Sequence, residues 1–213
     1  DSAVSDGIHV YWLEVAAKRI MKAEINAAPP PPITLVDGRA NMSSLASDKN
    51  NIYWLEPSKG SIVSDGAYLY FTGINTCTAS LCQPILVMGV PLSGGAPFTV
   101  ASLQRIDGIM RVPVTGEMPP VSLTPGASAN RIALDGEHLF WTSGALRSND
   151  GKVFKLKIAE TDGGVPIELA NNQASPDGIL AENGMIYWVN NCPAVTGEPP
   201  CGSVAKACAK HSE

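Results

Sequence analysis

The sequence contains few ionisable and few aromatic side chains. Of its 213 residues only 16% are charged and 6% are aromatic, and histidine occurs three times. Fifteen lysines and arginines are outnumbered by 20 aspartates and glutamates, which gives a net charge of −5. Binding to nucleic acid or to anionic lipid depends on a basic surface, so this balance argues against both kinds of partner.

Long apolar runs and catalytic patterns are also missing. No stretch approaches 18 consecutive apolar residues, so we predict no membrane span. No Ser/His/Asp arrangement, phosphate-binding glycine loop or histidine cluster is present. His9 and His138 follow equivalent turns, which indicates exposed turn residues, and His211 lies in the tail. We therefore predict no catalytic residues and no metal ligands.

The sequence is, however, rich in the turn-forming residues glycine and proline. Its 20 glycines and 17 prolines mostly separate short apolar runs, a pattern typical of many short strands and turns. One pattern, an apolar run, a polar turn and an aliphatic–aromatic–aromatic triplet, recurs five times without gaps. The copies are SDGIHVYW (5–12), SDKNNIYW (47–54), SDGAYLYF (64–71), LDGEHLFW (134–141) and AENGMIYW (181–188). Asp-Gly between alternating apolar residues predicts a tight hairpin, so we call each copy a first hairpin.

A second hairpin, with a glycine- or proline-rich turn, also recurs. Its copies are residues 20–36, 86–101, 109–124 and 153–170, and a further copy begins at 203–210. The two hairpins together make four antiparallel strands in about 45 residues, the length of a β-propeller blade. The sequence predicts an all-β fold, a single β-propeller domain over residues 1–213.

The paired aromatic residues of the first hairpins occupy one repeat position. Neighbouring residues on a strand point to opposite faces of the sheet, so one of each pair should pack between blades and the other against the opposite face. A repeated position of this kind is usually core. The predicted core pairs are Tyr11/Trp12, Tyr53/Trp54, Tyr70/Phe71, Phe140/Trp141 and Tyr187/Trp188.

The D-G-x-x-[LV]-Y-W motif, with I-M-x-V-P-L-x-G-G-like second hairpins, resembles bacterial extracellular propellers of the YWTD-like type. The resemblance covers nearly the whole chain and implies the propeller fold. The family's closing Asp is not kept after the aromatic residues of this sequence. The shared residues are structural, so the resemblance says little about function.

The repeat is interrupted twice. After Trp54 the chain passes directly into another first hairpin, and after Gln104 it passes directly into another second hairpin. Counting halves gives six blades of four strands, two of them incomplete, whereas six full blades would need roughly 270 residues. Incomplete blades would expose raw strand edges. We therefore predict that residues are missing near Gly60/Ser61 and near Gln104/Arg105.

The five cysteines indicate the redox environment of the protein. Cys77 and Cys82 bracket one loop between hairpins, and Cys192 and Cys201 bracket another. Spacings of four and eight residues without a nearby histidine fit zinc poorly, so we predict two disulfides and an oxidising compartment. Cys208 is left over, either free or paired with a residue in a missing segment.

The geometry of alternating strands defines two faces. Hairpin turns lie on a turn face, and the loops between hairpins and the links between repeats lie on the opposite loop face. The long, variable loops at 13–19, 73–85, 142–152 and 189–202 are where binding is expected. The candidate binding residues are the unrepeated polar residues Asn75, Arg105, Asp107, Arg147, Asn149, Asp150, Asn190 and Asn191.

The predicted function is a secreted, periplasmic or cell-surface binding or assembly module without enzymatic activity. Its partner would be a protein or a carbohydrate, and self-association is open. No cofactor is required; calcium at the repeated turn acids is left open, but those residues fit turn formers better. The alternatives are a propeller hydrolase, lactonase or lyase with an axial metal, and a structural subunit of a surface array or filament.

Overall fold

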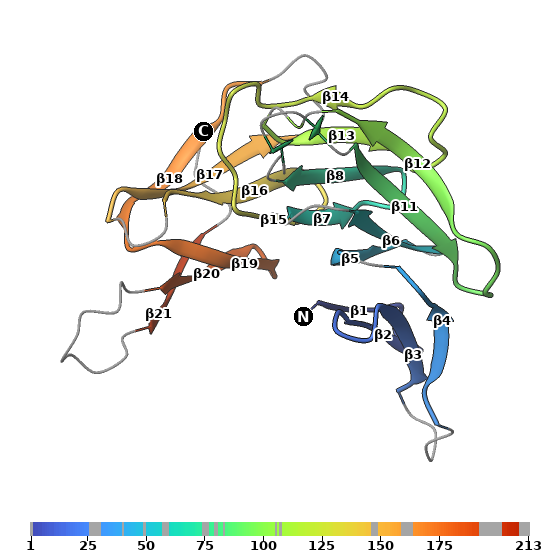
Figure 1. Cartoon of the computed structure of the whole chain (residues 1–213). Coiled ribbons are helices and arrows are strands. Elements are labelled where there is room, and N and C mark those ends of the chain that lie inside the picture. The colour runs from blue at the N-terminus through green and yellow to red at the C-terminus, as the bar shows by residue number, and fades with distance from the viewer. Residues whose placement is uncertain are drawn as a thin grey trace. The chain divides into compact units, whose positions relative to one another are not determined.

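The computed structural model describes residues 2–25, 31–39, 41–48, 50–56, 60–73, 77–78, 81–82, 84–104, 106, 108–145, 149–158, 164–191 and 202–208. The regular elements of these residues are all β-strands (Figure 1). They are β1 (Ala3–Ser5), β2 (His9–Glu14), β3 (Arg19–Glu24), β4 (Ile33–Val36), β5 (Ser43–Ser47), β6 (Asn51–Glu56), β7 (Gly60–Ser64), β8 (Tyr68–Gly73), β9 (Cys77–Thr78), β10 (Leu81–Cys82), β11 (Ile85–Pro91), β12 (Phe98–Leu103), β13 (Met110–Pro113), β14 (Val121–Ser122), β15 (Arg131–Leu134), β16 (His138–Ser143), β17 (Gly151–Lys157), β18 (Ile167–Gln173), β19 (Pro176–Glu182), β20 (Met185–Asn191) and β21 (Gly202–Cys208).

The chain divides into two compact units, residues 1–106 with 110–121 and residues 107–109 with 122–213. Unit 1 holds sheet 1 (β1-β2-β3-β4), sheet 2 (β5-β6-β11-β12), sheet 3 (β7-β8-β13-β14, with β14 at the unit boundary) and the pair β9–β10. Unit 2 holds sheet 4 (β15-β16-β17-β18) and sheet 5 (β19-β20-β21). The predicted all-β repeat of four-stranded antiparallel sheets is confirmed. That the whole chain is one domain stays a prediction.

The repeated aspartates close the first hairpins. Oδ1 of Asp6 accepts hydrogen bonds from the backbone N–H groups of Ile8 (2.8 Å) and His9 (2.6 Å). Gly7, between Asp6 and Ile8, has a φ of 87°, a left-handed conformation that costs glycine little free energy. The same pair of backbone contacts recurs at Asp48, Asp65 and Asp135. The interpretation of these acids as turn formers is confirmed.

Sheets 2 and 3 are interleaved along the chain. The first hairpin of sheet 2 (β5–β6) is followed by the first hairpin of sheet 3 (β7–β8) before either sheet receives its second hairpin. β6 then pairs with β11, with Tyr53 opposite Gly89, and β8 pairs with β13, with Phe71 opposite Met110. Four half-blades in the order first, first, second, second therefore make two complete sheets.

This pairing corrects the sequence prediction of two incomplete blades. The described residues form four four-stranded sheets and one three-stranded sheet, in addition to the short pair β9–β10, not six blades with two halved. The prediction of missing residues near Gly60/Ser61 and Gln104/Arg105 rested on unpaired hairpins. Each of those hairpins has another partner, since β6 pairs with β11 and β13 pairs with β8, so the ground for that prediction is removed.

The aromatic pairs set how neighbouring sheets pack. Tyr53 belongs to a buried cluster with Phe71 of sheet 3, and the adjacent Trp54 belongs to a different cluster with Tyr11 of sheet 1. We call the sheet face that carries the first residue of each pair the first-aromatic face, and the opposite face the second-aromatic face. In unit 1 the first-aromatic faces of sheets 1 and 2 thus pack on the second-aromatic faces of sheets 2 and 3.

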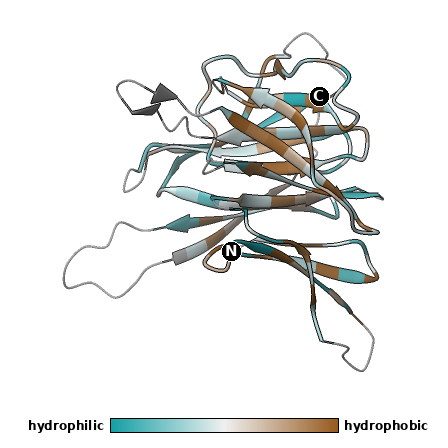
Figure 2. Ribbon diagram, turned by 45° about the vertical axis from the view of Figure 1, so that its right-hand side comes forward, coloured by the Kyte–Doolittle hydropathy of each residue, from teal (hydrophilic) through white to brown (hydrophobic). Residues whose placement is uncertain are grey.

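Unit 2 follows the same rule, since Phe140 of sheet 4 clusters with Trp188 of sheet 5. Eight of the ten predicted aromatic residues are buried, and the other two, Trp12 and Tyr187, are half-buried. The core prediction is therefore confirmed for most pairs. Figure 2 shows hydrophobic residues running along the strands.

Candidate functional site

Four of the eight predicted polar residues lie at the loop face of unit 2. Asn149 and Asp150 are exposed and directly precede β17, while Asn190 and Asn191 end β20. The first residue of β17 pairs with Gln173 at the end of β18. The Asn190 side chain is hydrogen-bonded to Gln173, so the start of β17 and the end of β20 lie next to each other.

Gln173 is the centre of this cluster. Its Oε1 accepts one hydrogen bond from the indole Nε1 of Trp188 and another from Nδ2 of Asn190, both at 2.9 Å. These bonds cross from sheet 4 to sheet 5 and fix the Asn190 amide. Oδ1 of Asn190 is buried and has no hydrogen-bond partner among the described residues. A buried acceptor without a donor is costly, so this atom favours a donor from water or from a ligand.

The end of β18 and the link from β18 to β19 hold the cluster in place. Asn172 (φ 52°) and Ser175 (φ 47°) are in the left-handed region, which is uncommon for residues with side chains. The carbonyl of Ser175 accepts a hydrogen bond from the backbone N–H of Asn191, at 3.2 Å. The link therefore positions Asn191 as well as Gln173.

Asn130, which precedes β15, and Thr142 of β16 hold the start of β19 in place. Nδ2 of Asn130 donates to the carbonyls of Gly144 (3.0 Å) and Pro176 (3.2 Å). Oγ1 of Thr142 donates to the carbonyl of Asp177 at 2.9 Å. The backbone beneath the amide cluster is thus held by several bonds, which suits a site that must keep its shape.

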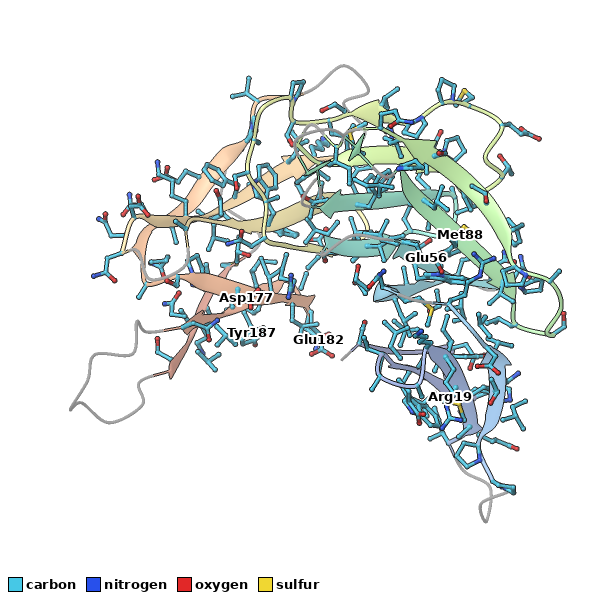
Figure 3. The ribbon with its side chains drawn as sticks, in the orientation of Figure 1. Arg19, Glu56, Met88, Asp177, Glu182 and Tyr187 are labelled. Atoms are coloured by element: carbon cyan, nitrogen blue, oxygen red, sulfur yellow. The ribbon has the colours of Figure 1, made fainter. Side chains whose placement is uncertain are left out.

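One ion pair also joins β15 to β19 next to this link. Nε of Arg131 is 3.4 Å from Oδ1 of Asp177, which is labelled in Figure 3. Both side chains are well exposed, so the pair contributes little to stability. It leaves one positive and one negative group beside the amides.

The loop face of unit 1 has a different character. The indole of Trp12 donates to Glu14 and Arg19 pairs with the same carboxylate; Trp54, Glu56 and Arg39 repeat this arrangement in sheet 2. Arg19 and Glu56 are labelled in Figure 3. The Arg19 guanidinium, together with the Trp12 indole, lowers the pKa of Glu14. These carboxylates are engaged by their own sheet or by the link beside it.

The remaining predicted residues have separate outcomes. Asn75, Arg105, Asp107, Arg147, Cys192 and Cys201 lie outside the described residues. In the pair β9–β10 the backbone register sets Cys77 opposite Cys82, but their disulfide stays a prediction. Cys208 is a free, exposed cysteine. Across the described ranges no three His, Cys, Asp or Glu side chains gather where they could hold a metal ion.

Sequence reasoning missed Gln173, Ser175, Asn130 and Thr142. It searched the loops between hairpins, whereas these residues belong to the link between repeats or to the strands beside it. The available signal was the polar run Asn171-Asn172-Gln173 at the end of a strand, followed by Ser175 before a proline.

Comparisons with known proteins agree with the fold. No protein-family model matches the sequence, and a search of curated proteins gives no match. Among solved structures, a Nidogen/Laminin complex matches with a TM-score of 0.51 and 15% identity over 89% of this chain and 71% of that one. TolB from Acinetobacter baumannii matches with 0.58 and 13% over 94% of this chain and 50% of that one. An oligogalacturonate lyase in complex with manganese matches with 0.56 and 9% over 91% and 58%.

These identities are low, so the likeness shows the fold alone: the protein has four-stranded antiparallel sheets that match those of β-propellers. The chain spans half to about seven tenths of the length of these three structures. Within the described residues no helix is long and apolar enough to cross a membrane.

Proposed function

We propose that the protein is a non-enzymatic binding module of a secreted, periplasmic or cell-surface kind, and that it contacts a protein partner through the loop face of unit 2. The observation that carries the proposal is the Gln173–Asn190 cluster, in which side-chain amides are fixed at the end of two packed sheets. Amide side chains donate and accept hydrogen bonds and so match the backbone groups of a protein ligand.

Two features support binding at this end. Asn149 and Asn191 are exposed beside the fixed amides, so polar groups stand on a rigid base. Arg131 and Asp177 add a charge of each sign. One structure with a similar fold is titled as a complex of nidogen with laminin, which gives a fold-level precedent for a protein partner.

The test compares variants on the two faces of unit 2. N149A/N191A removes exposed amides from the loop face, and E137A removes an exposed carboxylate from the turn face as a matched control. Each chain is measured by surface plasmon resonance against laminin and a panel of secreted proteins, and on an oligosaccharide array. We expect a protein ligand whose Kd rises about tenfold in N149A/N191A and is unchanged in E137A. Equal losses in both variants, or binding only to oligosaccharides, would contradict the proposal.

A further inference from the structure

The outer strand of each four-stranded sheet begins with an exposed apolar residue. The strands β4, β12, β14 and β18 each lie at one end of their sheet and follow a proline at the end of a second-hairpin turn (Figure 1). Their first residues are Ile33 (57% exposed), Phe98 (37%), Val121 (46%) and Ile167 (52%). Single exposed apolar residues are common on protein surfaces, but a position that is exposed and apolar in all four copies indicates an interaction surface.

This exposure does not arise from an uncovered sheet face. Sheet 2 is packed on both faces in unit 1, with Tyr53 in one buried cluster and Trp54 in another. Phe98 at the edge of this sheet is exposed nevertheless. Its ring lies against Gly89 on the neighbouring strand, where a Cβ would come within 2.7 Å of the ring. One side of the ring is therefore packed and the other side is open.

A contact between sheets 1 and 2 joins two of these residues. Ile33 lies opposite Lys22 on β3. Nζ of Lys22 donates a hydrogen bond to the carbonyl of Leu92, at 3.0 Å, and Leu92 begins the turn that leads to Phe98. The turn-side edges of the two sheets are thus joined where their apolar residues are exposed.

Sheet 3 continues the same edge. The turn before Val121 packs on β12 of sheet 2, since a Cβ on Gly116 would lie 2.7 Å from the carbonyl oxygen of Val100. Met118, in that turn, is 55% exposed. We call these exposed apolar residues of sheets 1 to 3 the turn rim of unit 1; they are Ile33, Phe98, Met118 and Val121.

The exposed charges beside the turn rim are of one sign. Among the described residues of the turn face in unit 1, the exposed charged side chains are Glu24, Asp65 and Glu117. Lys22 and Arg111, the cations of the adjoining strands, are half-buried, and their charged groups lie 5.7 and 4.8 Å from tyrosine ring centroids. This side of unit 1 therefore presents apolar residues next to negative charge.

This charge decides which partner the turn rim fits. Anionic lipid, and the same acidic rim on a second copy, would each be repelled by Glu24, Asp65 and Glu117. We propose that the turn rim of unit 1 binds a basic amphipathic segment of a partner protein. The aliphatic side chains of that segment pack on the rim, and its lysines or arginines pair with the three carboxylates. The surface lies in a different unit from the Gln173–Asn190 cluster, so it is a second binding site beyond the proposed function.

The first test measures the binding of short synthetic peptides to the full chain by fluorescence anisotropy. One peptide alternates leucine with lysine, another leucine with glutamate, and a third serine with lysine. The leucine–lysine peptide should bind with a Kd at least about tenfold below that of either other peptide, because its apolar and basic side chains both contribute. Raising the salt concentration from about 50 to about 500 mM should weaken its binding several-fold. Equal affinity for the lysine and glutamate peptides, or no binding of the leucine–lysine peptide up to about 1 mM, would overturn the proposal.

The second test locates the site on unit 1. I33S/E24Q removes one aliphatic side chain and one charge from the turn face, and V15S/D37N makes the same kinds of change at the loop face of the same unit. All four side chains are exposed, so both variants should fold like the wild type. The Kd of the leucine–lysine peptide should rise about tenfold in I33S/E24Q and stay unchanged in V15S/D37N. Equal losses in the two variants would show that the peptide does not recognise the turn rim.

A third test covers the sheet 3 end of the rim and the other occupants. M118S/E117Q should also raise the Kd of the leucine–lysine peptide about tenfold, because a segment that lies along the rim contacts both ends. Phosphatidylglycerol vesicles should not bind the wild-type chain through this surface, and sedimentation velocity up to about 200 µM should show no self-association through it. Vesicle binding or self-association that is present in the wild type and lost in I33S/E24Q would overturn the proposal in favour of lipid or a second copy.

Discussion

The hydroxyl of Tyr53 donates a 2.7 Å hydrogen bond to Oδ2 of Asp48, the residue whose other oxygen closes the hairpin turn. The tyrosine is fully buried, so its ring belongs to the core and its hydroxyl reaches the turn. Asp6–Tyr11 and Asp65–Tyr70 repeat the bond at 2.9 and 2.8 Å. Burial and the Asp48 carboxylate raise the pKa of Tyr53, which keeps the hydroxyl protonated as a donor. The carboxylate thereby couples turn conformation to sheet packing.

The first prediction concerns this coupling. Y53F removes the donor and leaves the Asp48 oxygen without its core partner, so the free energy of unfolding should fall by about 1–2 kcal/mol. Urea unfolding followed by tryptophan fluorescence measures the change. Y187F is the matched control, since Glu182 stands where the other repeats have aspartate and Tyr187 makes no such bond among the described residues. A loss in Y187F equal to that in Y53F would contradict the coupling.

The second prediction is a loss of stability in acid that depends on Asp6. Burial alone would raise the pKa of its carboxyl, but hydrogen bonds from the His9 and Ile8 backbone and from the Tyr11 and His9 side chains hold that pKa well below its usual range. A group whose folded pKa is depressed binds fewer protons when folded, so its contribution to stability grows with pH. That contribution is complete above the unfolded pKa of about 3.9 and is lost as the pH falls toward the folded value.

Denaturant unfolding at a series of pH values tests this sign. D6N keeps the turn acceptor but cannot ionise at this position, so the wild type should exceed D6N in stability near neutral pH. The difference should shrink steadily as the pH falls below about 4. A difference that stays constant from neutral pH to acid would show that the charge of Asp6 does not matter.

The third prediction concerns the glycine beneath the candidate site. A Cβ on Gly151 would overlap Pro176 Cδ and lie 2.7 Å from the carbonyl oxygen of Gln173. G151A should therefore push away the link that carries Gln173 and lower the free energy of unfolding by about 1–3 kcal/mol. G178A is the control, because a Cβ there has no neighbour within 4 Å and φ is not left-handed. Thermal unfolding compares them, and equal melting temperatures for G151A and the wild type would refute the clash.

The hairpins were predictable because their signals are local. Asp48 and Tyr53 lie five residues apart, and both the turn and the alternation of buried residues can be read within that window. The interleaving was not predictable from the same window. Tyr53 pairs with Gly89 across a complete intervening hairpin, and no local residue encodes which second hairpin a first hairpin will choose. That choice depends on the packing of whole faces.

The candidate site likewise has residues that could be predicted from the sequence and residues that could not. Asn190 and Asn191 could be selected from the sequence because they are unrepeated polar residues after a repeated strand. Gln173 stands out in the sequence only as the end of a polar run, because its role depends on Trp188, a residue of the next sheet that donates to it. The Glu14–Arg19 and Glu56–Arg39 ion pairs were likewise not predicted from the sequence. Each glutamate ends a strand, whereas Arg19 lies across a turn and Arg39 lies in the link between two sheets.

The last prediction assigns the cysteines of the described strands. Directly opposite residues of an antiparallel pair have Cα atoms about 4.5–5.5 Å apart, within the range that a disulfide spans. The register sets Cys77 opposite Cys82, so these two should be cross-linked. Cys208 is exposed and should be alkylated by maleimide without denaturant. No lysine or arginine lies between the two cysteines, so trypsin leaves both on one peptide, which should resist alkylation and gain two hydrogens only after reduction. Labelling of Cys77 in the native, unreduced protein would contradict the pairing, and C208S should lose the labelled peptide that contains position 208.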